Sequence, residues 1–315
     1  MKTKIFIDGS EGTTGLRIHE RIAVRDDIEV LTIDPEKRKD PAARAALINA
    51  SDITFLCLPD AAAVEAVSLV DNDHVRIIDA STAHRTLPGW NYGFPELSPD
   101  FRAGIKNGKR VAVPGCHASG FIASVYPLVK MGVIPADYPV SAFSLTGYSG
   151  GGKKMIAEYE GEGRGKLLDA PREYAMSQQH KHLKEMKAIT GLSQLPLFSP
   201  IVADYYSGMV VTVPLYTNLM SKKMDAAALQ AFFAEYYAGE KLVKVAPLGK
   251  EAEDRNFLSG NKLSGWDGME IYVTGNEERV LVSAVFDNLG KGASGAAIQC
   301  LNIMTGKDEG YGLNL

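Results

Sequence analysis

The sequence predicts an α/β protein in which a doubly wound parallel sheet is followed by an α+β domain with a mostly antiparallel sheet. Two observations support the first sheet: short apolar runs alternate with helical patterns, and a glycine-rich turn joins the first run to the first helix. The third observation concerns the second domain. From about Pro139 onward, strand-like runs follow one another with fewer helices between them.

The elements of the first half follow in order. Residues 4–7 form a short apolar run, and a helical pattern follows at Leu16, Ile18, His19, Ile22 and Ala23. Further runs at 29–33, 53–58 and 75–79 predict three more strands, and the alanine-rich segment 61–70 predicts a helix. This βαβαβ alternation is typical of a parallel sheet that binds its ligand outside the carboxyl ends of its strands.

The turn after the first strand predicts a dinucleotide site. Its sequence is Asp-Gly-Ser-Glu-Gly-Thr-Thr-Gly at residues 8–15, with glycines at 9, 12 and 15. In a Rossmann-type fold such glycines allow a tight turn, let backbone N–H groups approach a pyrophosphate, and let the helix pack closely on the sheet. We therefore assign cofactor contacts to Gly9, Ser10, Gly12, Thr13, Thr14 and Gly15. An ordinary glycine-rich βα turn is the alternative.

The second strand ends near a residue that bears on the choice of dinucleotide. Asp34 would bind a ribose 2′-hydroxyl, which indicates NAD. Three basic residues, Lys37, Arg38 and Lys39, follow at once, and Arg38 is the best candidate to hold the 2′-phosphate of NADP. The residues alone leave NAD and NADP open, and a solvated basic loop is the third interpretation.

The segment Val113-Pro114-Gly115-Cys116-His117 predicts a reactive thiol. A helical pattern follows from Ala118 to Met131, so Cys116 should lie where a strand turns into a helix N-terminus. The dipole there favours an anion, which should lower the pKa of the thiol and make it a better nucleophile. The loops at 9–15, 57–61, 79–85 and 114–117 should then face one crevice. A buried structural cysteine remains the alternative.

The second half supplies candidate partners for this thiol. The segment Ser149-Gly150-Gly151-Gly152-Lys153 follows a predicted strand at 140–148 and suits an anion such as phosphate, or is a flexible turn. His180 and His182 lie near the start of a predicted helix, and imidazole has the pKa of a general acid or base near neutral pH. As metal ligands they lack a completing cluster, so we expect no metal.

Further elements complete the second domain. Strands are predicted at 194–205, 208–215, 270–274 and 279–285, the last two paired around Gly275-Asn276, with a helix at 226–237. A glycine-rich loop over 287–299 should open a final helix that packs on the first domain.

Composition excludes several classes of protein. The chain has 315 residues, 45% hydrophobic and 23% charged, with a net charge of −4, and its pI is about 5.9. Nothing here indicates nucleic acid or a membrane surface as a partner, and the N-terminus becomes polar too soon for a signal peptide. Three widely spaced cysteines, at 57, 116 and 300, exclude a disulfide framework and suit a reducing cytoplasm.

The motifs together resemble the shorter class of the N-acetyl-γ-glutamyl-phosphate reductase family, within the aspartate-semialdehyde dehydrogenase-like superfamily. The resemblance covers nearly the whole chain. It rests on the glycine loop at 9–15, Pro114-Gly115-Cys116, residues 149–153, His180-Lys181-His182 and residues 287–293. It departs from the longer members at Ser10, where they have an aromatic residue, and at His117-Ala118, where they have Tyr-Pro.

The resemblance implies NADPH-dependent reduction of an acyl phosphate to an aldehyde in arginine biosynthesis. Cys116 would be the nucleophile and His180 or His182 the acid/base, while Asn288, Lys291 and Gly292 would lie by the nicotinamide and Arg85 would hold a substrate anion. We further expect Leu58, Pro59 and Ser81 at the cofactor, and Ser119, Ser149, Gly150, Gly151 and Lys153 at the substrate.

The implied domain plan is an NADP-binding domain over 1–117, completed by a C-terminal helix at 290–315, and a catalytic and oligomerisation domain over 118–289. We expect a cytoplasmic homo-oligomer, a dimer or tetramer. Two alternatives stay open: a related reductase acting on an aspartyl or aminoadipyl phosphate, and a nucleotide-sensing protein without turnover.

Overall fold

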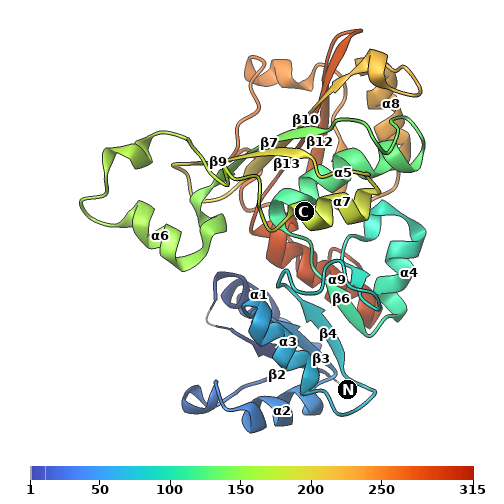
Figure 1. Cartoon of the computed structure of the whole chain (residues 1–315). Coiled ribbons are helices and arrows are strands. Elements are labelled where there is room, and N and C mark those ends of the chain that lie inside the picture. The colour runs from blue at the N-terminus through green and yellow to red at the C-terminus, as the bar shows by residue number, and fades with distance from the viewer. Residues whose placement is uncertain (1, 11) are drawn as a thin grey trace. The chain divides into compact units, whose positions relative to one another are not determined.

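A computed structural model describes residues 2–10 and 12–315 of the chain, and Glu11 of the glycine loop lies outside the described residues. The chain divides into two compact units. The first comprises Met1–Pro114 and Ala293–Leu313, and the second comprises Gly115–Gly292 with Asn314–Leu315. Each unit is built on one sheet, as Figure 1 shows.

The first unit holds a parallel six-stranded sheet in the order β2-β1-β3-β4-β6-β5. Its strands are β1 (Thr3–Asp8), β2 (Ile28–Leu31), β3 (Ile53–Leu56), β4 (Arg76–Asp79), β5 (Asn91–Tyr92) and β6 (Arg110–Ala112). Its α-helices are α1 (Thr13–Ala23), α2 (Pro41–Ala50), α3 (Asp60–Ser68), α4 (Pro99–Asn107) and α9 (Gly295–Thr305). The predicted parallel sheet is confirmed.

Alternation along β1 explains why helices cover both faces of this sheet. Ile5 and Ile7 join a core cluster with residues of α1 and α9, whereas Phe6, between them, joins a second cluster with residues of α2 and α3. Successive side chains of a strand point to opposite faces, so the consecutive apolar residues Ile5, Phe6 and Ile7 need cover on both faces of the sheet.

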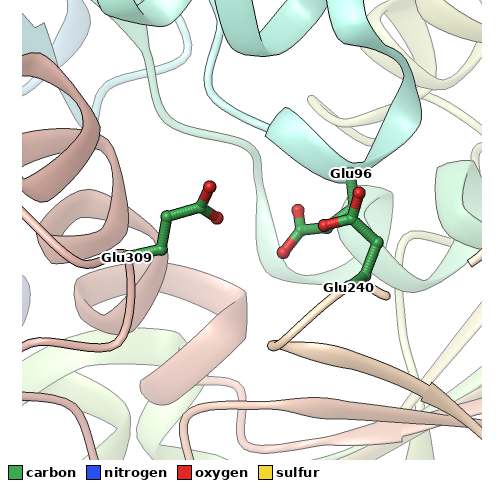
Figure 2. Close-up of side chains that lie close together, drawn as sticks. All are labelled: Glu96, Glu240 and Glu309. Carbon is green, nitrogen blue, oxygen red and sulfur yellow. The ribbon is translucent and has the colours of Figure 1, made fainter. Parts of the chain in front are cut away.

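Polar contacts fasten the C-terminal segment within the first unit. Gln299 on α9 donates from Nε2 to Glu96 Oε1 (2.8 Å) and to Glu309 Oε2 (3.1 Å), and Arg102 of α4 pairs with Glu309. Figure 2 draws Glu96 and Glu309, together with Glu240 of the second unit. Gln299 and Arg102 therefore bind these carboxylates of the first unit as structural contacts.

The second unit holds a seven-stranded mixed sheet in the order β11-β12-β13-β10-β7-β9-β8. Its strands are β7 (Ser141–Gly147), β8 (Arg172–Glu173), β9 (Leu197–Ala203), β10 (Met209–Tyr216), β11 (Val243–Val245), β12 (Met269–Gly275) and β13 (Arg279–Phe286). Its α-helices are α5 (Cys116–Lys130), α6 (Gly152–Glu160), α7 (Leu183–Thr190) and α8 (Ala226–Tyr236). The β7–β9 and β11–β12 pairs are parallel and the other described pairs are antiparallel, so the mostly antiparallel prediction is confirmed.

One face of this sheet is covered by helix α5, which packs on β10 and β13 and beside α7. Gly120 permits the close approach, because a Cβ built on it would lie 2.6 Å from Val211 Cγ2 and 2.8 Å from Phe286 Cε1. The helix that begins at Cys116 is thereby fixed on the sheet of its own unit.

Several predicted boundaries differ from the structure. Strand β2 ends at Leu31, so Asp34 lies beyond it in a loop and caps a 3₁₀ turn over Pro35–Lys37. The last helix is shorter than the predicted 290–315: a π-helical turn covers Gly290–Ser294, and α9 ends at Thr305 before Gly306, whose φ of 72° is left-handed. The glycine-rich segment after β7 is largely helical, with a 3₁₀ turn over Tyr148–Gly151 followed by α6.

Candidate active site

Cys116 is the first residue of α5, and Gly115 is the N-cap. The predicted helix start at Ala118 is therefore two residues late, and the cysteine belongs to the first turn itself. The first N–H groups of a helix lack intrahelical partners and carry a partial positive charge, so a thiolate at this position is favoured. Cys116 is partly exposed, as a nucleophile must be.

Glu185 fixes the backbone on which Cys116 is mounted. Its side chain is 2% exposed, and Oε2 accepts a hydrogen bond from the Gly115 N–H at 3.1 Å. Glu185 lies one helical turn after His182, so α7 presents both residues on one side. Glu185 is not among the residues predicted from the sequence, where the His-x-x-Glu spacing of residues 182–185 is its one local signal.

His180 and His182 lie together, with ring centroids 4.7 Å apart. His182 is buried and occupies the N-cap of α7, and its backbone N–H donates to His180 Nδ1 at 3.2 Å. The helix start predicted near His182 is confirmed. Both rings also lie near His117, the residue after the cysteine, at 5.4 and 5.6 Å.

His117 is a site residue that the sequence analysis did not assign. It is 3% exposed, with Nδ1 2.6 Å from Ser144 Oγ and Nε2 2.7 Å from the Tyr174 hydroxyl. Burial, and then the nearby charges of His180 and Lys181, lower the pKa of His117 to about 3. The imidazole of His117 is therefore neutral at physiological pH. This sets it apart from His180 and His182, for which we expect an acid/base role.

In the segment 149–153, which we predict to bind an anion, one side chain takes part in a structural hydrogen bond. Ser149 is buried and accepts a 3.0 Å hydrogen bond from Asn288 Nδ2, while Gly150, Gly151 and Lys153 are exposed. Asn288 Oδ1 in turn accepts from the Gly208 N–H at 2.8 Å. Asn288 thus ties together the loops after β7 and before β10, a role the sequence did not suggest.

The remaining predicted residues of the second unit lie close to Cys116 or in its helix. A Cβ built on Gly292 would lie 3.0 Å from Cys116 Cβ, so the two residues are in contact. Lys291 is 2% exposed. Ser119 is buried on α5, and its Oγ donates to the Gly115 carbonyl at 3.1 Å.

In the first unit, the glycine loop forms as a tight turn into α1. Gly9 has φ +89°, and a side chain there would collide with the Cys57 carbonyl. Gly12 is the N-cap and its N–H donates to the Gly9 carbonyl at 3.1 Å. The predicted cofactor residues Ser10, Thr13, Thr14 and Gly15 lie in the loop and in the first turn of α1.

The ends of β3 and β4 carry the other predicted residues of this unit. Leu58 and Pro59 follow β3, and Pro59 is the N-cap of α3. Asp79, the last residue of β4, is fully buried and accepts hydrogen bonds from Ser81 Oγ at 2.7 Å and from His84 Nδ1 at 2.6 Å. His84, which the sequence analysis did not assign, also stacks on Trp90.

Arg85, Asp34 and Arg38 differ in their surroundings. Arg85 is 8% exposed and donates from Nε to the Val113 carbonyl at 2.9 Å and from Nη2 to the Ala80 carbonyl at 3.2 Å. Asp34 and Arg38 are exposed; Asp34 Oδ1 accepts from the Glu36 N–H, and Arg38 Nε donates to the Pro35 carbonyl.

Cys57 and Cys300 provide a contrast with Cys116. Burial, and then the charges of Asp79 and Asp8, raise the pKa of Cys57 to about 12, and Cys300 is fully buried in the core of the first unit. Neither is suited to be a nucleophile at neutral pH.

Comparison with known proteins places this fold in a class. A family model described as "Semialdehyde dehydrogenase, dimerisation domain" matches residues 116–288. Aspartate semialdehyde dehydrogenase II of Vibrio cholerae, complexed with ASA, has a TM-score of 0.71 at 16% identity over 97% of this chain and 98% of that chain. Aspartate semialdehyde dehydrogenase of Candida albicans, solved with NADP, has a TM-score of 0.61 at 14% identity over 97% of this chain and 99% of that chain. The fold is thus that of the semialdehyde dehydrogenases.

The particular family follows from sequence identity. N-acetyl-gamma-glutamyl-phosphate reductase 2 of Nostoc sp. is 46% identical over 320 residues, which cover 99% of each chain. The chain belongs to the family of N-acetyl-gamma-glutamyl-phosphate reductases. No helix in the described part of the chain is long and apolar enough to cross a membrane.

Proposed function

We propose that this chain reduces N-acetyl-L-glutamyl 5-phosphate to N-acetyl-L-glutamate 5-semialdehyde and phosphate with NADPH, as a step of arginine biosynthesis. The observation that carries the proposal is Cys116 at the first position of α5, with Glu185 bonded to its supporting backbone and His180 and His182 on α7. The acyl group is supported by the names of relatives that match nearly the whole chain.

The proposed mechanism is covalent catalysis by Cys116. Its thiolate attacks the acyl carbonyl carbon; a C–S bond forms, the bond to the phosphate oxygen breaks, and phosphate leaves with the electron pair. NADPH, when bound, supplies the hydride that reduces the thioester. His180 or His182 then protonates the oxyanion of the hemithioacetal and takes the same proton back as the carbonyl re-forms, and cleavage of the C–S bond releases the aldehyde and restores the thiolate. Backbone N–H groups of the first turn of α5 stabilise the oxyanion.

The glycine loop fits a dinucleotide. A Cβ on Gly12 would meet no described atom closer than 3.5 Å, so the fold itself does not require glycine at this N-cap. A pyrophosphate approaching the backbone does require it. Gly9, Ser10, Gly12, Thr13, Thr14 and Gly15 would hold the pyrophosphate, Leu58, Pro59 and Ser81 would line the rest of the cofactor, and Lys291 and Gly292 would lie by the nicotinamide.

NADP is the proposed dinucleotide, with Arg38 as the ligand of its 2′-phosphate. Arg38 is exposed, whereas Oδ1 of Asp34 is engaged by the Glu36 N–H and is less available to a ribose hydroxyl. For the substrate we keep Arg85, Ser119, Lys153 and the Ser149–Gly151 turn as proposed anion-binding groups. The cysteines carry thiols, which suits a reducing compartment such as the cytoplasm.

The deciding experiment runs the reaction in reverse. We expect phosphate-dependent reduction of NADP⁺ with N-acetyl-glutamate semialdehyde, and loss of that activity after treatment with iodoacetamide. Aspartate and aminoadipate semialdehydes serve as competing substrates. A higher kcat/KM for either would reassign the acyl group, and cofactor binding without turnover of any of the three would favour the nucleotide-sensing alternative.

We also propose that the open face of the second sheet is a homo-oligomer interface. Phe143, Leu197 and Leu281 are 52, 68 and 42% exposed. Phe143 and Leu281 line a hollow of about 480 Å³ on the face opposite α5. Large exposed apolar patches of this kind mark interaction sites, and the matched family model is named for dimerisation.

A further inference from the structure

Three side chains, of which His117 and Ser144 are buried and Tyr174 is half-buried, form a hydrogen-bonded series next to Cys116. Ser144 on β7 contacts His117 Nδ1 at 2.6 Å, and Tyr174, one residue beyond β8, contacts His117 Nε2 at 2.7 Å. His117 follows Cys116 in the first turn of α5, so the series is anchored to the same turn as the thiol. Phe198 packs against the His117 ring at 5.4 Å.

The protonation states in this series are set by burial. The lowered pKa of His117 makes it neutral, so it donates one hydrogen bond and accepts the other. Burial, and then the negative charge of the Cys116 thiolate, raise the pKa of Tyr174, which therefore keeps its proton. The hydrogen bond to His117 Nε2 also places the Tyr174 hydroxyl against the residue that follows Cys116 in the chain.

We propose that Tyr174 is a neutral hydrogen-bond donor to the negative charge that develops at Cys116, and that His117, held by Ser144, is the residue that positions it. The proposal rests on the proposed function for its catalytic meaning. It assigns a task to His117 that is separate from the acid/base role of His180 or His182.

The required arrangement of protons is specific. Ser144 Oγ–H donates to Nδ1 of His117, and Nε2–H of His117 donates to the Tyr174 oxygen. The Tyr174 proton then points away from His117 and can be donated to a second acceptor, which we take to be the thiolate. Active-site hydrogen bonds are often long without substrate and shorten in the reacting complex. The other charged or titratable groups facing this series are His180, Lys181 and His182.

The test measures the thiol directly and needs no turnover. The rate of iodoacetamide modification of Cys116, resolved by peptide mass spectrometry, is followed from pH 5 to 10 in the full chain. In Tyr174→Phe the thiolate loses a charge-assisted hydrogen bond, so we expect the apparent pKa of the reaction to rise by about one unit. Tyr148→Phe is the matched control, because the Tyr148 hydroxyl donates to exposed Glu160.

Variants at His117 distinguish a role in positioning Tyr174 from a role in packing alone. We expect His117→Phe, which keeps the ring but loses both bonds, to raise the apparent pKa as Tyr174→Phe does. His117→Gln, whose amide can still donate from near the Nε2 position, should restore it in part. A folded Tyr174→Phe whose profile coincides with that of the unsubstituted chain would overturn the proposal. If the pH profile of Cys116 modification shifts in Tyr174→Phe but the unsubstituted chain turns over no semialdehyde, the proposed function is overturned. The role of Ser144, His117 and Tyr174 beside the thiol is then still supported.

Discussion

At the scale of single residues, Cys116 differs from the other two cysteines first in its position. It occupies the first turn of a helix, whereas Cys57 and Cys300 lie among core residues of the first unit. The surroundings that distinguish it come from α7: Glu185 holds the Gly115 N–H, and two histidines precede Glu185 on the chain. The proposed nucleophile is therefore distinguished by its neighbours as much as by its own chemistry.

Replacing this thiol tests the mechanism. We expect Cys116→Ser to lower kcat by at least about 10³-fold, because a serine hydroxyl stays protonated where a thiol ionises. NADPH binding, followed by fluorescence titration, should change little. Cys57→Ala is the control and should keep turnover, since the raised pKa of Cys57 makes it unreactive. Wild-type activity in Cys116→Ser would exclude the thioester mechanism.

His117 should make the stability of the protein depend on pH. Its folded pKa of about 3 lies below the ordinary value of 6.5, so in this interval the unfolded chain binds a proton that the folded chain does not. The free energy of unfolding should therefore fall as the pH drops below 6.5, by about 2 kcal/mol from His117 between pH 7 and pH 5. Urea unfolding of His117→Gln should show a correspondingly weaker fall; an equal fall in both proteins would contradict the assigned pKa.

At the scale of elements, α5 carries the proposed nucleophile and depends on a close approach to β10 and β13. We expect Gly120→Ala to push the helix from the sheet and to lower the free energy of unfolding by about 1–3 kcal/mol. Gly165→Ala is the matched control, because a Cβ there meets no atom within 4 Å and its φ of −70° suits alanine. Guanidinium unfolding measures both. Equal stability of the two variants would show that the approach is not tight.

Long apolar elements could be predicted from the sequence, and short ones could not. Helix α5 followed from Phe121, Ile122, Val125 and Leu128, and the β12–β13 pair followed from the turn at Gly275-Asn276. Strands β5 and β8 have two residues each and no pattern of their own. They exist because a neighbouring strand offers hydrogen bonds, and this depends on the fold.

At the scale of the whole molecule, the open face of the second sheet should decide the oligomeric state. We expect Leu281→Arg to dissociate the native oligomer, because a charge in an apolar interface loses hydration without gaining a partner. Light scattering at several concentrations measures the mass. Val24→Arg, on an 85% exposed residue of the first unit, is the control. An unchanged mass in Leu281→Arg would place the interface elsewhere.

The sequence by itself determined the parallel sheet, the mostly antiparallel second sheet, the glycine loop after the first strand and the position of Cys116 at a helix start, because these depend on patterns between near neighbours in the chain. Only the tertiary structure decided the surroundings of that cysteine. Ser144, Tyr174 and Glu185 are far from Cys116 in sequence, and His117 gave no local sign of being neutral. Burial and hydrogen bonding fix protonation states, and both arise only when distant segments pack together.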